Sequence, residues 1–95
     1  MRVTPVTYVR RMNPRRLLKK LRQDELANVR FTDLTRLVET LGFELARIRG
    51  SHHVYSHPDI PAILNLQNVR GEAKPYQIRQ VLRTMTQHGL DITDS

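Results

Sequence analysis

The stretch FELARIRGSHHVYSH, residues 43–57, predicts a β-hairpin and with it the fold. The runs FELARIR and HHVYSH flank Gly50-Ser51. This pair suits a two-residue turn, because glycine accepts a positive φ without strain. Such a turn places Arg49 opposite His52. The two predicted strands are therefore antiparallel neighbours.

Alternation along a regular hairpin divides its side chains between two faces. His52 then falls on one face and His53 on the other. The nearest neighbours of His52 across the strands are arginines, a poor environment for burial, so we predict that His52 is the exposed histidine. A regular register also places Phe43 and Leu45 on the face of His52. These two apolar side chains argue against that assignment.

Segments on both sides of the hairpin predict the rest of the fold. TDLTRLVETLG, residues 32–42, has apolar residues at i, i+3, i+4 and i+7 before a glycine suited to a helix end. Residues 75–89 repeat this stripe between a proline and a glycine. AILNLQN, residues 62–68, supplies a third strand. This order predicts an α+β fold in which both helices cover one face of a three-stranded antiparallel sheet and the other face is open.

An additional helix is predicted before this unit. Asn13 suits the N-cap and Pro14 the first helical position of NPRRLLKKLRQ, residues 13–23. Residues 1–12 show no periodicity, and we expect a flexible arm there. We expect residues 13–95 to form a single domain, since a chain of this length supports one hydrophobic core.

Charge and composition narrow the classes of function. Sixteen basic and nine acidic residues give a net charge of +7, which favours a polyanionic partner such as nucleic acid. Half of the basic residues lie within residues 1–22, where there is no acid, so the remainder is nearly neutral. The lack of cysteine excludes disulfides and thiolate zinc sites. No apolar run is long enough to cross a bilayer, so we expect a cytoplasmic protein without a membrane partner.

Three histidines of the hairpin, His52, His53 and His57, raise the question of a metal site. His53 and His57 share a predicted strand face but lie about 13 Å apart by strand rise. His52 points to the other face. Metal ligands must meet about 2 Å from a shared centre. The spacing therefore predicts no metal site and no metal cofactor.

The same histidines suit acid–base chemistry on RNA. RNA carries its own nucleophile, the 2′-hydroxyl beside each phosphate, and a histidine can deprotonate it or protonate the leaving 5′-oxygen without a metal. Arg47 and Arg49 would favour the neutral form of a nearby histidine and stabilise charge on a phosphorane. Alternatives remain open: a surface hairpin merely rich in histidine, a non-catalytic RNA-binding module, or a module that binds only protein.

Further basic residues are candidates for binding phosphates. Lys74 precedes the last predicted helix, and Arg79 and Arg83 share one side of it at i and i+4. A solvated helix face explains the same pattern. Tyr55 and Tyr76 could stack on a base, although half-buried packing is the more common role of tyrosine at such positions.

Several segments resemble the HicA family of toxins from type II toxin–antitoxin systems, also called YcfA-like proteins. They are Gly42-Phe43, Gly50-Ser51-His52-His53 followed by Tyr55, and AKPYQIRQ at residues 73–80. The resemblance covers about residues 30–90. It implies a fold similar to double-stranded RNA-binding domains (dsRBD-like), metal-independent cleavage of mRNA, and neutralisation by a HicB-like antitoxin protein.

The resemblance also assigns the catalytic role to a histidine of the Gly-Ser-His segment. Carried over, this residue is His52, with His53 as the alternative, because some members lack the first histidine and keep the second. Gly50 and Ser51 then join the candidate RNA contacts. Compact members begin almost at the helix that here starts near Asp33. The helix before it is a feature of longer members, and the arm before that belongs to neither.

Overall fold

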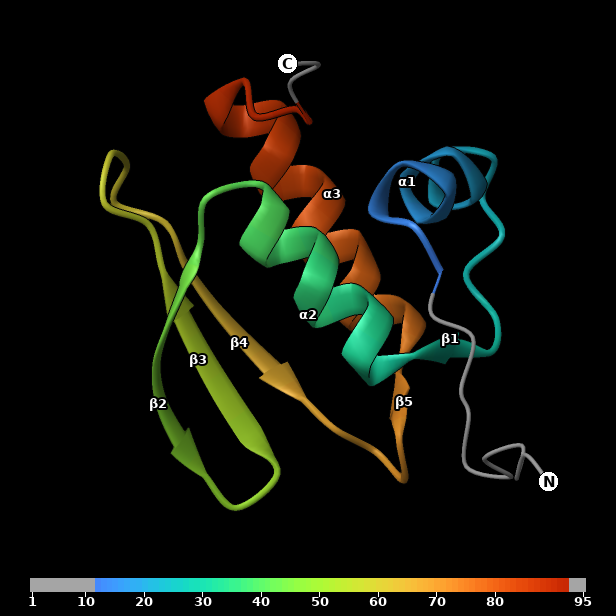
Figure 1. Cartoon of the computed structure of the whole chain (residues 1–95), viewed down its shortest axis with the longest axis horizontal. Helices are drawn as coiled ribbons and strands as arrows, with labels where there is room; N and C mark the ends of the chain where they lie inside the picture. Colours follow the sequence, from blue (N-terminus) through green and yellow to red (C-terminus); the bar gives the residue numbers. More distant parts are fainter. Residues whose placement is uncertain (1–11, 93–95) are drawn as a thin grey trace, which may run out of the picture.

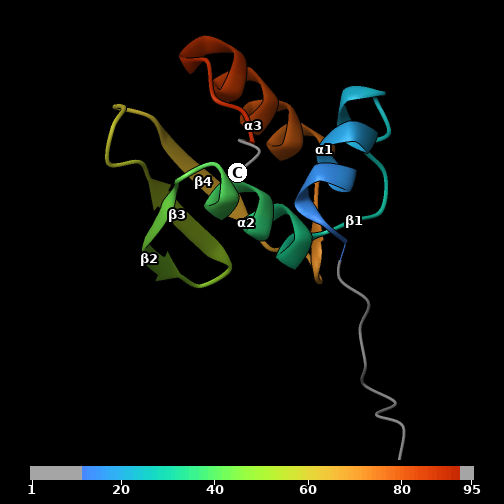
Figure 2. The same ribbon diagram turned by 45° about the horizontal axis from the view of Figure 1, so that its top comes forward.

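The computed structural model describes residues 12–92 and confirms the predicted α+β fold (Figure 1). A three-stranded antiparallel sheet has the order β2-β3-β4, and α2 and α3 lie together on one side of it (Figure 2). The order of helix, three strands and helix is that of a dsRBD-like fold, with α1 added in front. The elements are α1 Pro14–Arg22, β1 Val29–Arg30, α2 Phe31–Thr40, β2 Glu44–Arg49, β3 His52–Ser56, β4 Ile63–Gln67, β5 Glu72–Ala73 and α3 Pro75–His88.

The predicted apolar stripes meet in one core between the sheet and the two helices. Side chains of α2, β4 and α3 are completely buried there, among them Leu34, Leu37, Leu64, Leu66 and Ile78. Each contributes about 1.5–3 kcal/mol by leaving water. Because β4 directs its leucines into this core, its alternate side chains lie on the uncovered face of the sheet.

The additional helix α1 begins as predicted. The side-chain oxygen of Asn13 accepts a hydrogen bond of 2.8 Å from the Arg15 N–H, and Pro14 opens the helix. Three leucines bury the apolar side of α1 against α2, namely Leu17, Leu18 and Leu21. This helix is therefore part of the folded unit.

A second, two-stranded sheet was not predicted. In it β1 pairs antiparallel with β5, with Val29 opposite Ala73 and Arg30 opposite Glu72. Strands of two residues are too short to show a period, so the sequence around β5 looked like a simple connection. The pairing ties the start of α2 to the start of α3, and the Phe31 N–H donates to the Gly71 carbonyl at 2.8 Å.

The predicted arm, residues 1–12, lies outside the described residues except for Met12. The Met12 N–H donates to Asp33 Oδ1 at 3.3 Å, and Asp33 is buried. Within residues 12–92, no helix combines the length and the apolar character needed to span a membrane.

Candidate active site

The β2–β3 hairpin has the predicted register at its tip. Arg49 pairs with His52 and Arg47 with Val54. Gly50 opens the turn with a φ of +59°, the left-handed conformation that favours glycine. The turn residues predicted from sequence therefore place His52 at the start of β3.

A register shift between Leu45 and Arg47 changes the other half of the hairpin. Beyond it, Leu45 pairs with Tyr55, and Phe43 lies in the core with an exposed fraction of 3%. The prediction that Phe43 and Leu45 share the face of His52 is therefore wrong. It assumed regular alternation, which a bulge inverts. The bulge thus removes the sequence argument against an exposed His52.

The uncovered face of the sheet brings His52 together with residues of both neighbouring strands. Arg49 flanks His52 on the β2 side and Gln67 on the β4 side, and Arg47 and Asn65 occupy the next row of the same face. Directly paired residues of an antiparallel ladder point to the same face. We call these five residues the open-face cluster. It joins one acid–base group, two guanidinium groups and two amides.

The imidazole of His52 is exposed and held from one side. Its Nδ1 lies 3.1 Å from Asn65 Oδ1. Because a carbonyl oxygen only accepts hydrogen bonds, the contact assigns the hydrogen of the neutral ring to Nδ1. Nε2 then carries the lone pair. In this form the ring can accept a proton at Nε2.

His53 is half-buried on the helix-covered side of β3. Its ring packs edge-to-face against Phe31, the first residue of α2, with centroids 4.8 Å apart. Its Nδ1 lies 3.3 Å from the Ser51 carbonyl. These contacts make His53 less accessible to a large substrate than His52.

His57 uses both ring nitrogens within the fold. Nε2 donates to the Leu41 carbonyl at 3.0 Å, and Nδ1 accepts from the Asp59 N–H at 3.1 Å. The ring also packs edge-to-face on Phe43 with centroids 5.0 Å apart. His57 therefore connects the end of β3 to the end of α2 and has a structural role.

The three histidines have different partners and do not converge on a common centre. Within residues 12–92, no group of three or more His, Cys, Asp or Glu side chains is arranged to hold a metal ion. The open-face cluster has a single imidazole and no carboxylate. Its donor set suits a phosphate better than a cation.

Gln67 links the hairpin turn to α3. Its Nε2 donates to Ser51 Oγ at 3.4 Å, and its Oε1 accepts from the Tyr76 hydroxyl at 3.4 Å. The Gln67 N–H donates to Oε1 of the buried Gln77 at 2.8 Å. Two consecutive residues of α3 thus hold the end of β4, directly across from His52.

The two tyrosines singled out from the sequence differ sharply in exposure. Tyr55 is 2% exposed and Tyr76 is 60% exposed. Burial, and next the negative charge of Glu39, raise the pKa of the Tyr55 phenol, while a hydrogen bond with Thr35 acts in the opposite direction. Tyr55 is a core residue, so of these two tyrosines only Tyr76 can stack on a ligand.

The basic residues predicted for RNA binding on α3 are exposed. Lys74 is the N-cap residue, and Arg79 and Arg83 lie on the helix itself. Tyr76, Arg79 and Arg83 follow one another at i, i+3 and i+7, so they share one exposed stripe. The structure thereby connects this stripe to the open-face cluster through Tyr76 and Gln67. Their binding role stays a prediction.

Asn65 and Gln67 were not predicted from the sequence as residues of the site. The signal was present in ILNLQ, residues 63–67, where polar and apolar residues alternate. Since Leu64 and Leu66 are buried, Asn65 and Gln67 must face the other side. A third-strand prediction, followed through residue by residue, would have placed both amides beside His52.

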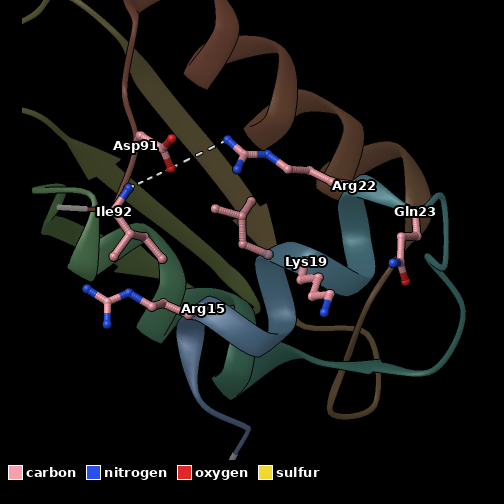
Figure 3. Close-up of a pocket in the computed structure, with 7 residues that line it drawn as sticks. Arg15, Lys19, Arg22, Gln23, Asp91 and Ile92 are labelled. Carbon is pink, nitrogen blue, oxygen red and sulfur yellow. Dashed lines mark hydrogen bonds and ion pairs between the residues drawn. The ribbon is translucent and has the colours of Figure 1, made fainter. Parts of the chain in front are cut away.

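A hollow of about 450 Å³ lies elsewhere, between α1 and the C-terminal end of the described chain (Figure 3). Arg22 and Asp91 form an ion pair of 3.5 Å across it. Its lining shares no residue with the open-face cluster; it consists of Arg15, Leu18, Lys19, Arg22, Gln23, Asp91 and Ile92. The cluster instead lies on an open sheet surface, which suits a long substrate chain.

Comparison with known proteins identifies a family. The family model described as the HicA toxin of bacterial toxin–antitoxin systems matches residues 31–90. This span begins at the first residue of α2, contains the whole open-face cluster and leaves α1 and β1 outside. The comparison with curated proteins and that with solved structures each return no match.

Proposed function

The chain belongs to the HicA family of toxins from bacterial toxin–antitoxin systems, and we propose that it is a metal-independent endoribonuclease that cleaves mRNA. As a toxin of such a system it has a cognate antitoxin, for which we propose a HicB-like protein. The acid–base group is His52. One observation carries this choice: of the three hairpin histidines, His52 alone has its ring on the open face, while His53 and His57 pack against the fold.

The proposed reaction uses the ribose of the substrate as nucleophile. Nε2 of neutral His52 removes the proton from a 2′-hydroxyl, and the 2′-oxygen forms a bond to the adjacent phosphorus. The bond from phosphorus to the 5′-oxygen breaks, and the 5′-oxygen leaves with a proton from water or from the imidazolium. The products are a 2′,3′-cyclic phosphate and a 5′-hydroxyl. The atoms and charges of this cleavage step balance without a metal ion or an external oxidant.

The arginines of β2 support this assignment electrostatically. Arg47 and Arg49 lie on the same face as His52 and add two positive charges beside it. Guanidinium groups bind phosphate oxygens in a bidentate manner, and they stabilise the charge that develops on a phosphorane. A substrate phosphate held by these groups brings its neighbouring 2′-hydroxyl close to the imidazole.

A second candidate function is RNA binding without cleavage. The stripe of Tyr76, Arg79 and Arg83 favours it, because this stripe can bind RNA without any acid–base group. This function predicts RNA affinity that falls steeply with salt and no cleavage product at any pH.

Growth provides the first test. Production of the chain in a bacterial host is expected to arrest growth, because mRNA cleavage stops protein synthesis. Co-production of the protein encoded by the adjacent open reading frame is expected to restore it. The measurement is the number of colonies with each plasmid combination, together with mapping of cut mRNA ends. Normal growth in cells that contain the folded chain would contradict the proposal.

A further inference from the structure

Tyr76 presents an exposed aromatic ring beside the hairpin turn. Its ring lies in the first turn of α3 and is 60% exposed, although its hydroxyl is held by Gln67 at 3.4 Å. Gln67 is the direct ladder partner of His52 and also contacts Ser51 Oγ. Gln67 thus connects this aromatic ring to the strand position opposite the proposed reacting group.

We propose that Tyr76 and Gln67 form a subsite for one unpaired nucleobase of the RNA chain, an inference that rests on the proposed function. A tyrosine has only two side-chain torsions, and its hydroxyl contact holds the ring before the ligand arrives. Every base offers a π-face for stacking. Beyond these contacts the Gln67 carboxamide has a second N–H and a second oxygen lone pair, which offer a donor and an acceptor to the edge of the base.

The same helix gives the bound strand a direction. Arg79 and Arg83 continue from Tyr76 along one exposed stripe of α3. Phosphates beyond the stacked base would contact these two arginines in turn. A base stacked on Tyr76 has to be unpaired, so the substrate class is single-stranded RNA or a loop. The strand thus runs from the hairpin tip along α3.

Binding of a strand that cannot be cleaved tests the subsite. The probe is a short single-stranded 2′-fluoro oligonucleotide of mixed sequence, measured by fluorescence anisotropy. Tyr76→Ala is expected to raise its Kd roughly tenfold or more, whereas Tyr76→Phe keeps most of the affinity. Gln23→Ala, which removes an exposed amide at the end of α1, is the control and leaves the Kd unchanged.

A strand made of abasic residues separates stacking from charge. The wild type and Tyr76→Ala are expected to bind this backbone equally, because there is no base to stack. Equal affinities for the base-containing probe would overturn the subsite. The probe lacks the 2′-nucleophile, so the result does not depend on cleavage. The proposed function is tested separately by incubating natural RNA with the wild type. RNA that stays intact would contradict that function.

A separate contact carries a second inference, which also rests on the proposed function. Asn65 lies between the fully buried Leu64 and Leu66, so the backbone that holds its amide is fixed. Its Oδ1 meets His52 Nδ1 at 3.1 Å. We infer that Asn65 is a positioning residue: it orients the ring, selects the Nδ1–H tautomer and leaves Nε2 as the base.

The pH–rate profile tests this role. A carboxylate at the same place stabilises the imidazolium, so the neutral base forms only at higher pH. Asn65→Asp is therefore expected to move the acidic limb of the profile upward by roughly one pH unit. Asn65→Leu, which keeps the volume but not the acceptor, is expected to lower kcat roughly tenfold or more at unchanged KM.

Gln87→Glu makes the same change of charge at an exposed position of α3 and serves as the control, with an unshifted profile. A profile of Asn65→Asp that coincides with that of the wild type would overturn the positioning role. A wild type without cleavage activity would instead overturn the proposed function. The two failures are thus distinct.

Discussion

His52→Ala is expected to abolish RNA cleavage while the protein still folds and binds RNA. Loss of a general acid–base group lowers the rate by about 10²–10⁴. The His52 ring is exposed and forms a hydrogen bond with the side chain of Asn65. Its removal by the alanine substitution therefore leaves the core intact. Cleavage of natural RNA gives the rate, and the 2′-fluoro strand gives the affinity. Addition of EDTA to the wild type is expected to leave the rate unchanged.

The other histidines provide matched controls. His88→Ala removes an exposed imidazole at the end of α3 and is expected to keep full activity. His53→Ala loses the contact with Phe31 and is expected to lower stability more than the rate per folded molecule. Full activity of His52→Ala combined with inactive His53→Ala would transfer the catalytic role to His53. Absence of cleavage in the wild type itself would favour the non-catalytic RNA-binding module.

The hairpin shows what periodicity can and cannot predict. Its tip was predictable, because the Gly50-Ser51 turn fixes which residues pair next to it, and Arg49 indeed faces His52. The bulge before Arg47 was not predictable, because an extra residue in one strand leaves no trace in composition. Its effect was large, since it moved Phe43 from the predicted open face into the core.

The surroundings of His52 depend on contacts between segments far apart in sequence. The alternation of β4 contains enough information to place its two amides on the open face, although they were not predicted. Their distance to the hairpin depends on how β4 pairs with β3. The link from Gln67 to Tyr76 depends further on where α3 begins over the edge of β4. Local pattern thus predicted the helices, the three-stranded sheet and the exposed position of His52, while tertiary packing supplied the groups that surround it.

The geometry of β3 explains why the two neighbouring histidines have different surroundings. Successive side chains of β3 point to opposite faces, so His53 packs on α2 and His52 cannot. A single-residue change of register would exchange them. The buried Tyr55 of β3 opposes this slip, because the slip would turn its ring from the core toward water. Burial on one face therefore secures the placement of the proposed acid–base group on the other.

Gly42→Ala is expected to be the most destabilising small substitution at the end of α2. Gly42 has a φ of +101°, and a Cβ there would lie 2.6 Å from Nε2 of His57. The positive φ costs an alanine about 1–2 kcal/mol. Displacing the ring breaks its hydrogen bond to Leu41 and costs about 1–3 kcal/mol more. We expect the free energy of unfolding, measured in urea, to fall by about 3 kcal/mol.

Gly71→Ala separates the cost of the positive φ from the cost of displacing the His57 ring. Gly71 also has a positive φ, +85°, but an added Cβ would meet nothing within 4 Å. It is therefore expected to lose only the backbone share, about 1–2 kcal/mol. In the His57→Ala background the obstructing ring is gone, so the further cost of Gly42→Ala is expected to shrink to that same share. Equal losses for Gly42→Ala and Gly71→Ala in the wild-type background would show that the close approach of His57 is not what requires glycine here.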